Sequence, residues 1–349
     1  MKKLEDLVRP HILQLKPYSS ARDEFSGTDG ILLDANENAF GSTTQENYNR
    51  YPDPYQRRLK EKIADIKKVA PEQIFLGNGS DEPIDLIIRL FCSPRIDNVV
   101  VMPPTYDMYS VSATINDTEV RKVTLTKEYD IDINNVFNTV DEYTKLIFIC
   151  SPNNPTGNSL NNDSIKRIIQ HFEGMVVLDE AYIDFSVNKS LIRYLGESEN
   201  LIVLQTFSKA WGLAGLRLGL AFGSPYVIKL LNKIKFPYNI NQATQQLVEK
   251  ALESENIKDE MVKKIIDQRK FLERELRSLD IVEKIYPSDA NFLLVRFKDA
   301  VKVHQFLLEN NVIVRNRSKL VLCEQALRIT AGTSEENKAL LSYLKKFEQ

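Results

Sequence analysis

The sequence predicts a two-domain α/β protein, and three observations support this prediction. The chain has 349 residues, which is more than one hydrophobic core usually serves. In its middle part, short apolar runs alternate with segments of helical periodicity, a pattern typical of a mainly parallel sheet covered by crossover helices. After Pro237 the pattern changes to a long charged helical stretch followed by strand-like segments. This change indicates a second, smaller α+β domain.

Five segments of the middle part are expected to form strands, because they are short and rich in Val, Ile, Leu and Phe. They are Ile74–Gly77, Asn98–Met102, Lys145–Cys150, Met175–Asp179 and Leu201–Gln205. Two segments between them place apolar residues three or four positions apart, on one face of a helix. These residues are Ile84, Ile87, Ile88 and Phe91 in the first segment and Ile165, Ile168, Ile169 and Phe172 in the second. We expect both helices to cover the sheet.

The smaller domain is expected to open with a long helix, about Thr244 to Ser278, followed by strands at Ile281–Tyr286 and Asn291–Phe297. A helix carrying Leu340, Tyr343, Leu344 and Phe347 should end it. The sequence contains no Gly/Ser linker, so the domains should pack closely. The expected boundaries are residues 1–39 for an N-terminal arm that joins the small domain, 40–240 for the large domain and 241–349 for the small domain.

Composition narrows the classes of function. Hydrophobic residues make up 43% and charged residues 27% of the chain, as in ordinary globular proteins. A net charge of -2 gives no electrostatic reason to expect a nucleic-acid partner. We expect neither a signal peptide nor a membrane-spanning helix, and therefore a cytoplasmic protein. The three cysteines and three histidines are scattered, so no disulfide framework and no metal site are expected.

Ligands of open α/β sheets bind at the carboxyl ends of the strands. After the first predicted strand, the segment Gly77–Glu82 leads directly into a helix. Backbone N–H groups at such a helix start can hold an anion. The segment lacks the third glycine of a dinucleotide fingerprint and the GK[ST] ending of a P-loop. Ser80 or Asp81 could instead cap the helix, and both interpretations hold together if the acidic side chains point away from the anion.

The fourth predicted strand ends in two carboxylates, Asp179 and Glu180, after a wholly apolar run. A carboxylate at that position needs a partner. It could cap a helix. Alternatively, it could pair with the protonated ring nitrogen of pyridoxal phosphate (PLP) and keep that ring electron-poor.

The fifth predicted strand leads into LIVLQTFSKAWGLAGLRLG, residues 201–219. Lys209 follows two hydroxyls, Thr206 and Ser208, and Arg217 comes two turns later. Lysine forms a reversible imine with an aldehyde, and hydroxyls with a guanidinium suit a phosphate dianion. Taken alone, Lys209 would more often be a solvated lysine at a helix start. Its co-occurrence with the other motifs favours cofactor chemistry.

Together these motifs resemble those of fold-type I PLP aminotransferases, and of the histidinol-phosphate aminotransferases in particular. TFSKAWGLAGLRLG is similar to the family's lysine motif, and LDANEN, YPDP, GNGSDE, NNPTG and DEAY appear in the family's order. The resemblance spans nearly the whole chain. It implies PLP-dependent transfer of the amino group of L-histidinol phosphate to 2-oxoglutarate, giving imidazole-acetol phosphate and glutamate in histidine biosynthesis.

The resemblance also implies a role for each matching residue. Lys209 would form the imine with PLP and then act as general base, and Asp179 would bind the pyridine nitrogen. Tyr182 and Asn154 would hydrogen-bond the phenolic oxygen, and Tyr106 would stack on the ring. The PLP phosphate would be held by the backbone amides of Ser80 and Asp81 and by the side chains of Thr206, Ser208 and Arg217.

Substrate anions and the partner subunit complete the implied site. Arg315 and Arg328, with Tyr18, Arg22 and Asn154, would bind the substrate phosphate or the carboxylate of glutamate. Surface ion pairing is the alternative interpretation for Arg22 and for Arg317, a neighbour of Arg315. In this family Tyr51, from the YPDP motif, is supplied by the other subunit, so the resemblance implies a homodimer with shared active sites.

Two other classes of function stay open. The first is a related PLP enzyme, such as an aromatic aminotransferase or a threonine-phosphate decarboxylase, which would use the same lysine and aspartate. The second is a non-catalytic PLP-binding regulator. Such a regulator would need an attached DNA-binding domain, and the segment before the motifs has no basic helix-turn-helix pattern.

Overall fold

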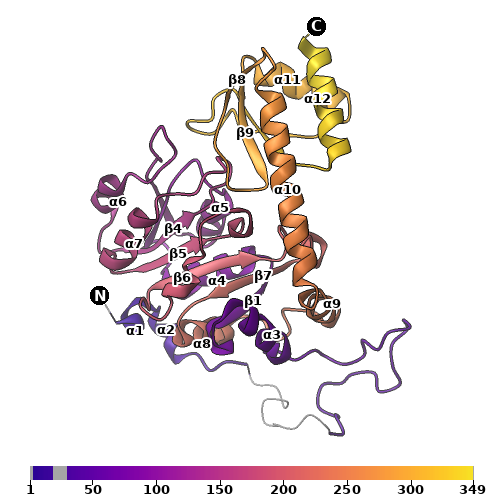
Figure 1. Ribbon diagram of the computed structural model, residues 1–349. Helices are drawn as coiled ribbons and strands as arrows, with labels where there is room; N and C mark the ends of the chain where they lie inside the picture. The colour runs from indigo at the N-terminus through magenta and orange to yellow at the C-terminus, as the bar shows by residue number, and fades with distance from the viewer. Residues whose placement is uncertain (1–2, 19–29, 349) are drawn as a thin grey trace.

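The computed structural model describes residues 3–18 and 30–348. A large sheet with helices on both faces forms the lower part of Figure 1, and a small sheet with its own helices forms the upper part. One long helix, α10 (Glu255–Leu276), runs from the lower part into the upper. Within the described ranges, no helix has both the length and the apolar character that a membrane crossing requires.

The large sheet has seven strands in the order β1-β7-β6-β5-β4-β2-β3. β7 runs antiparallel to β1 and β6, and the other neighbours are parallel. The mainly parallel α/β fold is therefore confirmed, and each of the five predicted strands is present. The strands are β1 Ile74–Asn78, β2 Asn98–Val101, β3 Glu119–Lys122, β4 Thr144–Cys150, β5 Met175–Asp179, β6 Leu201–Thr206 and β7 Leu218–Phe222.

Each strand contributes to two cores, because successive side chains point to opposite faces of a sheet. In β5, Val176 and Leu178 belong to the core on one face, whereas Met175 and Val177 belong to the core on the other. Full burial of such a side chain stabilises the fold by roughly 1.5–3 kcal/mol. The first core is covered by α3 (Arg57–Lys67), α6 (Ile133–Thr139) and α7 (Asn162–His171), and the second by α4 (Asp81–Phe91), α5 (Met108–Ile115) and α8 (Pro225–Ile234).

The N-terminal helices pack on the large domain, which corrects the expectation that residues 1–39 join the small domain. α1 (Leu4–Leu7) and α2 (Pro10–Gln14) bury Leu7 and Ile12 in the core shared with α4 and α8. Lys233, on α8, donates a hydrogen bond to the Leu13 carbonyl at 2.8 Å. The reason is that apolar side chains at helical spacing find an open apolar surface between α4 and α8.

A single long helix over residues 244–278 was expected, but two helices form. α9 (Gln242–Leu252) ends before Glu253–Ser254, and α10 begins directly after this break. Val248 and Leu252 of α9 belong to the large domain's core, whereas the small domain's core begins with Leu272 of α10. The transition between the domains therefore lies within α10 and not at residue 241.

The small sheet is antiparallel throughout, in the order β10-β11-β9-β8. Its strands are β8 Val282–Ile285, β9 Phe292–Phe297, β10 Arg315–Asn316 and β11 Ala326–Thr330. The upper end of α10, α11 (Ala300–Glu309) and α12 (Ser334–Glu348) cover it. The α+β character predicted for this part of the chain is thus present.

Candidate active site

A cavity of about 420 Å³ lies between the carboxyl ends of the large sheet's strands and the small domain. The structure brings together there most of the predicted site residues, from segments far apart in the sequence. Those that line it are Ser80, Asp81, Tyr106, Asn154, Asp179, Tyr182, Thr206, Ser208, Lys209, Arg217, Arg315 and Arg328. Arg317 and Cys150 line it as well, although no role had been predicted for either.

Asp179 ends β5 at the floor of this cavity and is buried. Its Oδ1 accepts a hydrogen bond from the N–H of Ala181 at 2.9 Å, and its Oδ2 accepts one from the hydroxyl of Tyr109 at 2.6 Å. Burial raises the pKa of Asp179, and these two hydrogen bonds oppose the rise. Oδ1 of Asp179 thus fixes the turn that follows β5, while the carboxylate still borders the cavity.

Glu180, the next residue, points away from the cavity. Its carboxylate accepts hydrogen bonds from the N–H of Leu191 at 2.7 Å, from the amide of Gln205 at 3.0 Å and from the Ser190 hydroxyl. Two adjacent buried carboxylates therefore have different functions, since only Asp179 lines the cavity. Glu180 connects loops behind the site.

Lys209 lies in a turn directly after β6 and not at the start of a helix, which removes one alternative interpretation. Its amine is 5.7 Å from the centroid of the Tyr182 ring. Burial lowers the pKa of Lys209, and the cation of Arg328 lowers it further, while Asp179 opposes this shift. A lowered pKa increases the share of neutral amine, which is the form that acts as nucleophile or base.

The start of α4 and Arg217 lie at the same cavity, where together they could hold an anion. Ser80 occupies the N-cap position, but its hydroxyl donates to the Gln205 carbonyl at 3.3 Å, so it does not cap the helix. Gly79 has φ +72°, and a Cβ there would collide with the Arg217 guanidinium. Only glycine therefore allows this close approach. The N–H groups of the first helical turn and the guanidinium face the same corner of the cavity.

The two acids of this segment behave differently, so the condition that both point away from an anion is met by only one of them. Glu82 does so, because its carboxylate accepts from the N–H of Asn78 and from Asn239. Asp81 instead faces the cavity: its Oδ2 lies 3.4 Å from Arg217 Nη2, and its Oδ1 accepts from Tyr106 at 3.1 Å. An anion bound here would compete with Asp81 for Arg217.

Aromatic side chains form the walls. Tyr106 lies edge-on to Tyr109, with ring centroids 5.5 Å apart, and Tyr109 in turn stacks on Phe148 at 4.9 Å. Tyr182 is buried against Phe292 in an edge-to-face contact at 5.2 Å. Burial raises the pKa of Tyr182, so its hydroxyl stays protonated and can donate a hydrogen bond to an oxygen in the cavity.

The small domain contributes arginines to the opposite wall. Arg315 and Arg328 are cross-strand partners in the β10–β11 pair, so they project from the same face of the sheet. Arg328 Nη1 donates to Asn154 Oδ1 at 2.6 Å, and its guanidinium lies 5.3 Å from the centroid of Phe292. Arg328 therefore connects the small domain to the loop that follows β4.

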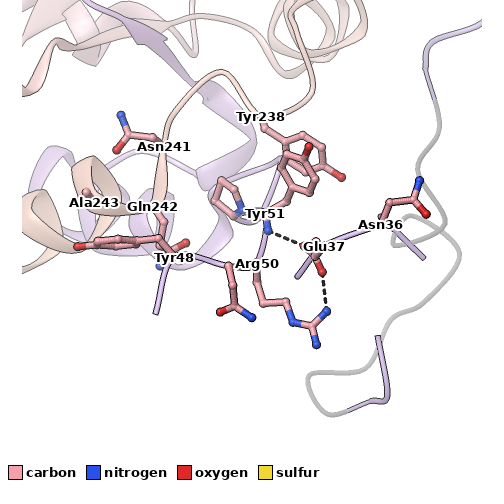
Figure 2. Close-up of a pocket in the computed structure, with 11 residues that line it drawn as sticks. Asn36, Glu37, Tyr48, Arg50, Tyr51, Tyr238, Asn241, Gln242 and Ala243 are labelled. Atoms are coloured by element: carbon pink, nitrogen blue, oxygen red, sulfur yellow. Dashed lines mark hydrogen bonds and ion pairs between the residues drawn. The ribbon is translucent and has the colours of Figure 1, made fainter. Parts of the chain in front are cut away.

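Three predicted residues are not placed in the cavity. Tyr51 lines a second pocket of about 460 Å³, where its ring stacks on Tyr238 at 4.5 Å (Figure 2). Glu37 holds this segment, because its carboxylate accepts from the Tyr51 N–H at 2.6 Å and from Arg50 Nη1 at 2.7 Å. Tyr18 is 69% exposed, and Arg22 lies outside the described residues.

Sequence reasoning missed Tyr109 and Arg317. Tyr109 was visible only as the second tyrosine of TYDMY; it lies in the first turn of α5, whereas Tyr106 precedes that helix. Arg317 was visible as the second arginine of Arg315-Asn316-Arg317. Because side chains alternate between the two faces of a strand, it lies on the same face as Arg315. Within the described residues, no group of three or more His, Cys, Asp or Glu gathers as a metal site would require.

Comparison with known proteins adds to this geometry. Residues 28–344 match the family described as aminotransferase class I and II. A histidinol-phosphate aminotransferase of Cytophaga hutchinsonii is 54% identical over 344 residues, which cover 99% of each chain. The crystal structure of the histidinol-phosphate aminotransferase from Clostridium acetobutylicum is similar in fold, with a TM-score of 0.80 at 23% identity over 86% of this chain and 91% of that one. The enzyme of the same name from Sinorhizobium meliloti, in complex with pyridoxal-5'-phosphate, gives 0.78 at 22% identity over 90% of each chain.

Proposed function

This chain belongs to the class I and II aminotransferases and, within them, to the histidinol-phosphate aminotransferases, and from this membership we propose that it transfers the amino group of L-histidinol phosphate to 2-oxoglutarate. The products are imidazole-acetol phosphate and glutamate. The observation that carries the proposal is one cavity lined by a lysine whose pKa burial lowers, by a buried aspartate, by Arg217 and, from the small domain, by Arg315 and Arg328. We assign one anion site to each of these two groups of arginines. One anion site serves the cofactor, and the other serves the substrate.

The donor set of the cavity fits PLP, the cofactor of this family. When bound, PLP withdraws electrons from the substrate's Cα and so makes the proton on that carbon acidic. The chain supplies the Lys209 amine for the cofactor's aldehyde and the Asp179 carboxylate for its ring nitrogen. Tyr182 is available for the cofactor's phenolic oxygen, and Tyr106 for the face of its ring. The PLP phosphate is assigned to the first turn of α4 at Ser80 and Asp81 and to Thr206, Ser208 and Arg217.

Lys209 moves the proton. Its Nζ takes the proton from the substrate's Cα, a task that the neutral amine favoured by burial can perform. Asp179 would pair with the ring nitrogen, and Tyr109 supports the negative charge of Asp179 with a hydrogen bond. Tyr182 and Asn154 would donate hydrogen bonds to the phenolic oxygen. Tyr106 would stack on the ring.

The two substrates share one anion site, because each reacts in its own half of the cycle. Arg328 and Arg315 bind the phosphate of the amino donor in one half-reaction and a carboxylate of glutamate in the other, since bidentate arginine contacts suit both groups. Arg328 is the better fixed of the two through its hydrogen bond to Asn154. This link also couples substrate binding to the residues around the cofactor.

A panel of amino donors, each scored against 2-oxoglutarate, tests the proposed function. We expect one glutamate for each histidinol phosphate consumed, and a higher kcat/KM for this donor than for L-histidinol or for aromatic amino acids. Preference for phenylalanine or tyrosine would instead identify an aromatic aminotransferase. Release of carbon dioxide from threonine phosphate would identify a decarboxylase, and absence of turnover with every donor would favour a PLP-binding regulator.

The substitution Tyr109→Phe is expected to weaken PLP binding in a pH-dependent way. It removes the hydrogen bond to Asp179 Oδ2 but preserves the ring that stacks on Phe148. Losing a donor to a carboxylate raises its pKa further, so the fall in PLP affinity on acidification begins at higher pH. Titration of the apoprotein with PLP across pH measures this shift, and we expect affinity near neutral pH to fall about tenfold, as for one hydrogen bond to a charged group.

Tyr129→Phe is the matched control for that experiment. The Tyr129 hydroxyl also donates a hydrogen bond, to the Leu322 carbonyl at 2.5 Å in a partly buried position, but this residue does not line the cavity. The control should lose some stability while its pH profile for PLP binding stays unchanged. Equal profiles for Tyr109→Phe and the wild type would contradict the role given to Tyr109.

We also propose a homodimer in which Tyr51 completes the partner's cofactor site. The segment that carries Tyr51 extends away from the body of the protein at the lower right of Figure 1. It exposes Ile31 by 92%, Leu33 by 85% and Phe40 by 102%. Large apolar side chains gathered in one extended segment are compatible with an interface to a second copy of the chain. Tyr51 itself is placed outside its own chain's cavity, which supports delivery to a second one.

Mixing two inactive variants tests this arrangement. In a dimer of one Lys209→Ala chain and one Tyr51→Ala chain, the site that contains Lys209 receives Tyr51 from its partner and is therefore intact. We expect the mixture, after unfolding and refolding together, to be more active than either variant refolded alone. If each chain used its own Tyr51, no intact site would form, and the mixture would show only the average of the two variants.

We also propose a cytoplasmic location, on the evidence of the cysteines. Cys92, Cys150 and Cys323 are all free thiols and all buried, as expected for a protein that works in a reducing compartment.

A further inference from the structure

Arg317 occupies an unusual position in the cavity wall. It follows β10, and its N–H donates to the Ala326 carbonyl at 2.9 Å, so strand geometry continues to this residue. The alternation of a strand therefore places its side chain on the same face as that of Arg315. Arg315, Arg317 and Arg328 all line the cavity. Three guanidinium groups thus converge on one end of the site.

The contacts of Arg317 leave it under-satisfied. Its side chain is only 13% exposed, yet the ion pair that it makes within residues 3–18 and 30–348 is a long one, 3.5 Å from Nη1 to Asp107 Oδ2. Its Nε is buried without a hydrogen-bond partner in the described part of the chain. Buried guanidinium donors normally have partners, because leaving one without costs free energy. Arg317 also lines the cavity, so a ligand there can offer an acceptor to the Nη groups at the end of this side chain.

The local charge indicates the kind of ligand. Burial lowers the pKa of both Arg317 and Arg328, and Asp107 raises the pKa of both. One carboxylate beside three guanidinium groups leaves two positive charges uncompensated. A phosphate monoester carries about -1.5 to -2 charges near neutral pH and presents three acceptor oxygens. A carboxylate carries one charge and presents two oxygens.

We propose that Arg317 is a specificity-determining residue that selects an amino donor bearing a phosphate monoester. The inference rests on the proposed function and assigns the selectivity within it. Arg328 and Arg315 suffice for the two oxygens of a carboxylate, so they serve both half-reactions. Arg317 binds the third oxygen, which only the phosphorylated donor has. Asp107 holds the guanidinium in place across the domain boundary when no phosphate is bound.

The test is to measure the two half-reactions separately in Arg317→Gln. Single-turnover experiments follow the cofactor's absorbance with histidinol phosphate, L-histidinol or glutamate as the donor. We expect the ratio of kcat/KM for histidinol phosphate to that for L-histidinol to fall at least about tenfold, the loss of one hydrogen bond between charged groups. The value for glutamate should stay within about twofold, since its carboxylate does not need Arg317.

Lys319→Gln is the matched control, because it removes the same charge from the same segment at an exposed residue that does not line the cavity. All three donors should keep their wild-type values in it. Asp107→Asn distinguishes phosphate binding by Arg317 from a merely structural role of its ion pair. It removes the ion pair between Asp107 and Arg317 but keeps the guanidinium, so selectivity for the phosphorylated donor should persist. Should Arg317→Gln not fold, Arg317→Lys replaces it, since lysine keeps the positive charge but lacks the planar guanidinium that can make two parallel hydrogen bonds.

Three outcomes would overturn the inference. They are an unchanged ratio in Arg317→Gln, an equal loss with glutamate and with histidinol phosphate, and a loss in Asp107→Asn that matches that of Arg317→Gln. The last two would mean that Arg317 acts by holding the domains together. Failure of the proposed function looks different, because the wild type itself would then show no preference for histidinol phosphate over L-histidinol.

Discussion

Lys209→Ala is expected to lower the transamination rate by about 10⁴-fold or more, since it removes the nucleophile and the proton-transfer group together. The fold should persist, because Lys209 lies in a turn beside the cavity and not in a core. Borohydride reduction of the wild type followed by peptide mass analysis checks the assignment. It should place the cofactor's mass on the peptide containing Lys209, and the variant should carry none there.

A second lysine provides the control for this labelling. Burial and the nearby charge of Lys235 lower the pKa of Lys60 to about 8, so Lys60 is also a reactive amine on grounds of pKa. It does not line the cavity that contains the residues assigned to the PLP phosphate. Equal labelling of Lys60 and Lys209 would show that amine reactivity alone decides the reaction, and it would contradict the site described here.

Asp179→Asn is expected to reduce kcat by about 10²–10⁴-fold, because breaking a buried charge pair costs roughly 3–5 kcal/mol. Asparagine has nearly the same shape and can still accept the N–H of Ala181, so the turn after β5 should remain. It lacks the negative charge that keeps the ring nitrogen protonated. Stopped-flow absorbance with histidinol phosphate measures the rate of the first half-reaction directly.

Glu180→Gln is the matched control, since it neutralises the adjacent buried carboxylate. Glu180 binds Ser190, Leu191 and Gln205 behind the site. This variant should therefore lower the free energy of unfolding while its PLP-saturated form retains the wild-type rate. A comparable loss of rate in both variants would mean that Asp179 acts through the local fold and not through its charge.

Much of the large domain could be predicted from the sequence. Strands such as β5 are continuously apolar, and their bounds agree with the expected ones to within a residue. β3 was missed because EVRK is polar and lies at the edge of the sheet. β7 was missed because its apolar run directly follows the lysine motif and was interpreted as part of it. The break between α9 and α10 was missed because Glu253 and Ser254 interrupt the helical pattern only weakly.

Site residues were predictable where a reactive or charged side chain stands at or just after the end of an apolar strand, as Asp179 and Lys209 do. The contacts that arise only in three dimensions were not predictable. Tyr109 reaches Asp179 from a helix 70 positions away in the sequence, and Arg317 meets Asp107 across the domain boundary. Sequence spacing cannot reveal such pairs without the fold. Tyr18, predicted to bind substrate, and Tyr51, predicted to bind the cofactor, both lie outside the cavity of this chain; the proposed homodimer would account for Tyr51.

The long helix α10 has a mechanical consequence. It is continuous over 22 residues, which corresponds to a rod of about 33 Å. One end is seated beside the lysine and aspartate half of the site, and the other carries the sheet with the arginines. A tilt of about 5° at the break before Glu255 would move the far end of such a rod by roughly 3 Å, about one hydrogen-bond length. The angle between α9 and α10 therefore determines how far the arginines proposed to bind substrate lie from the large sheet.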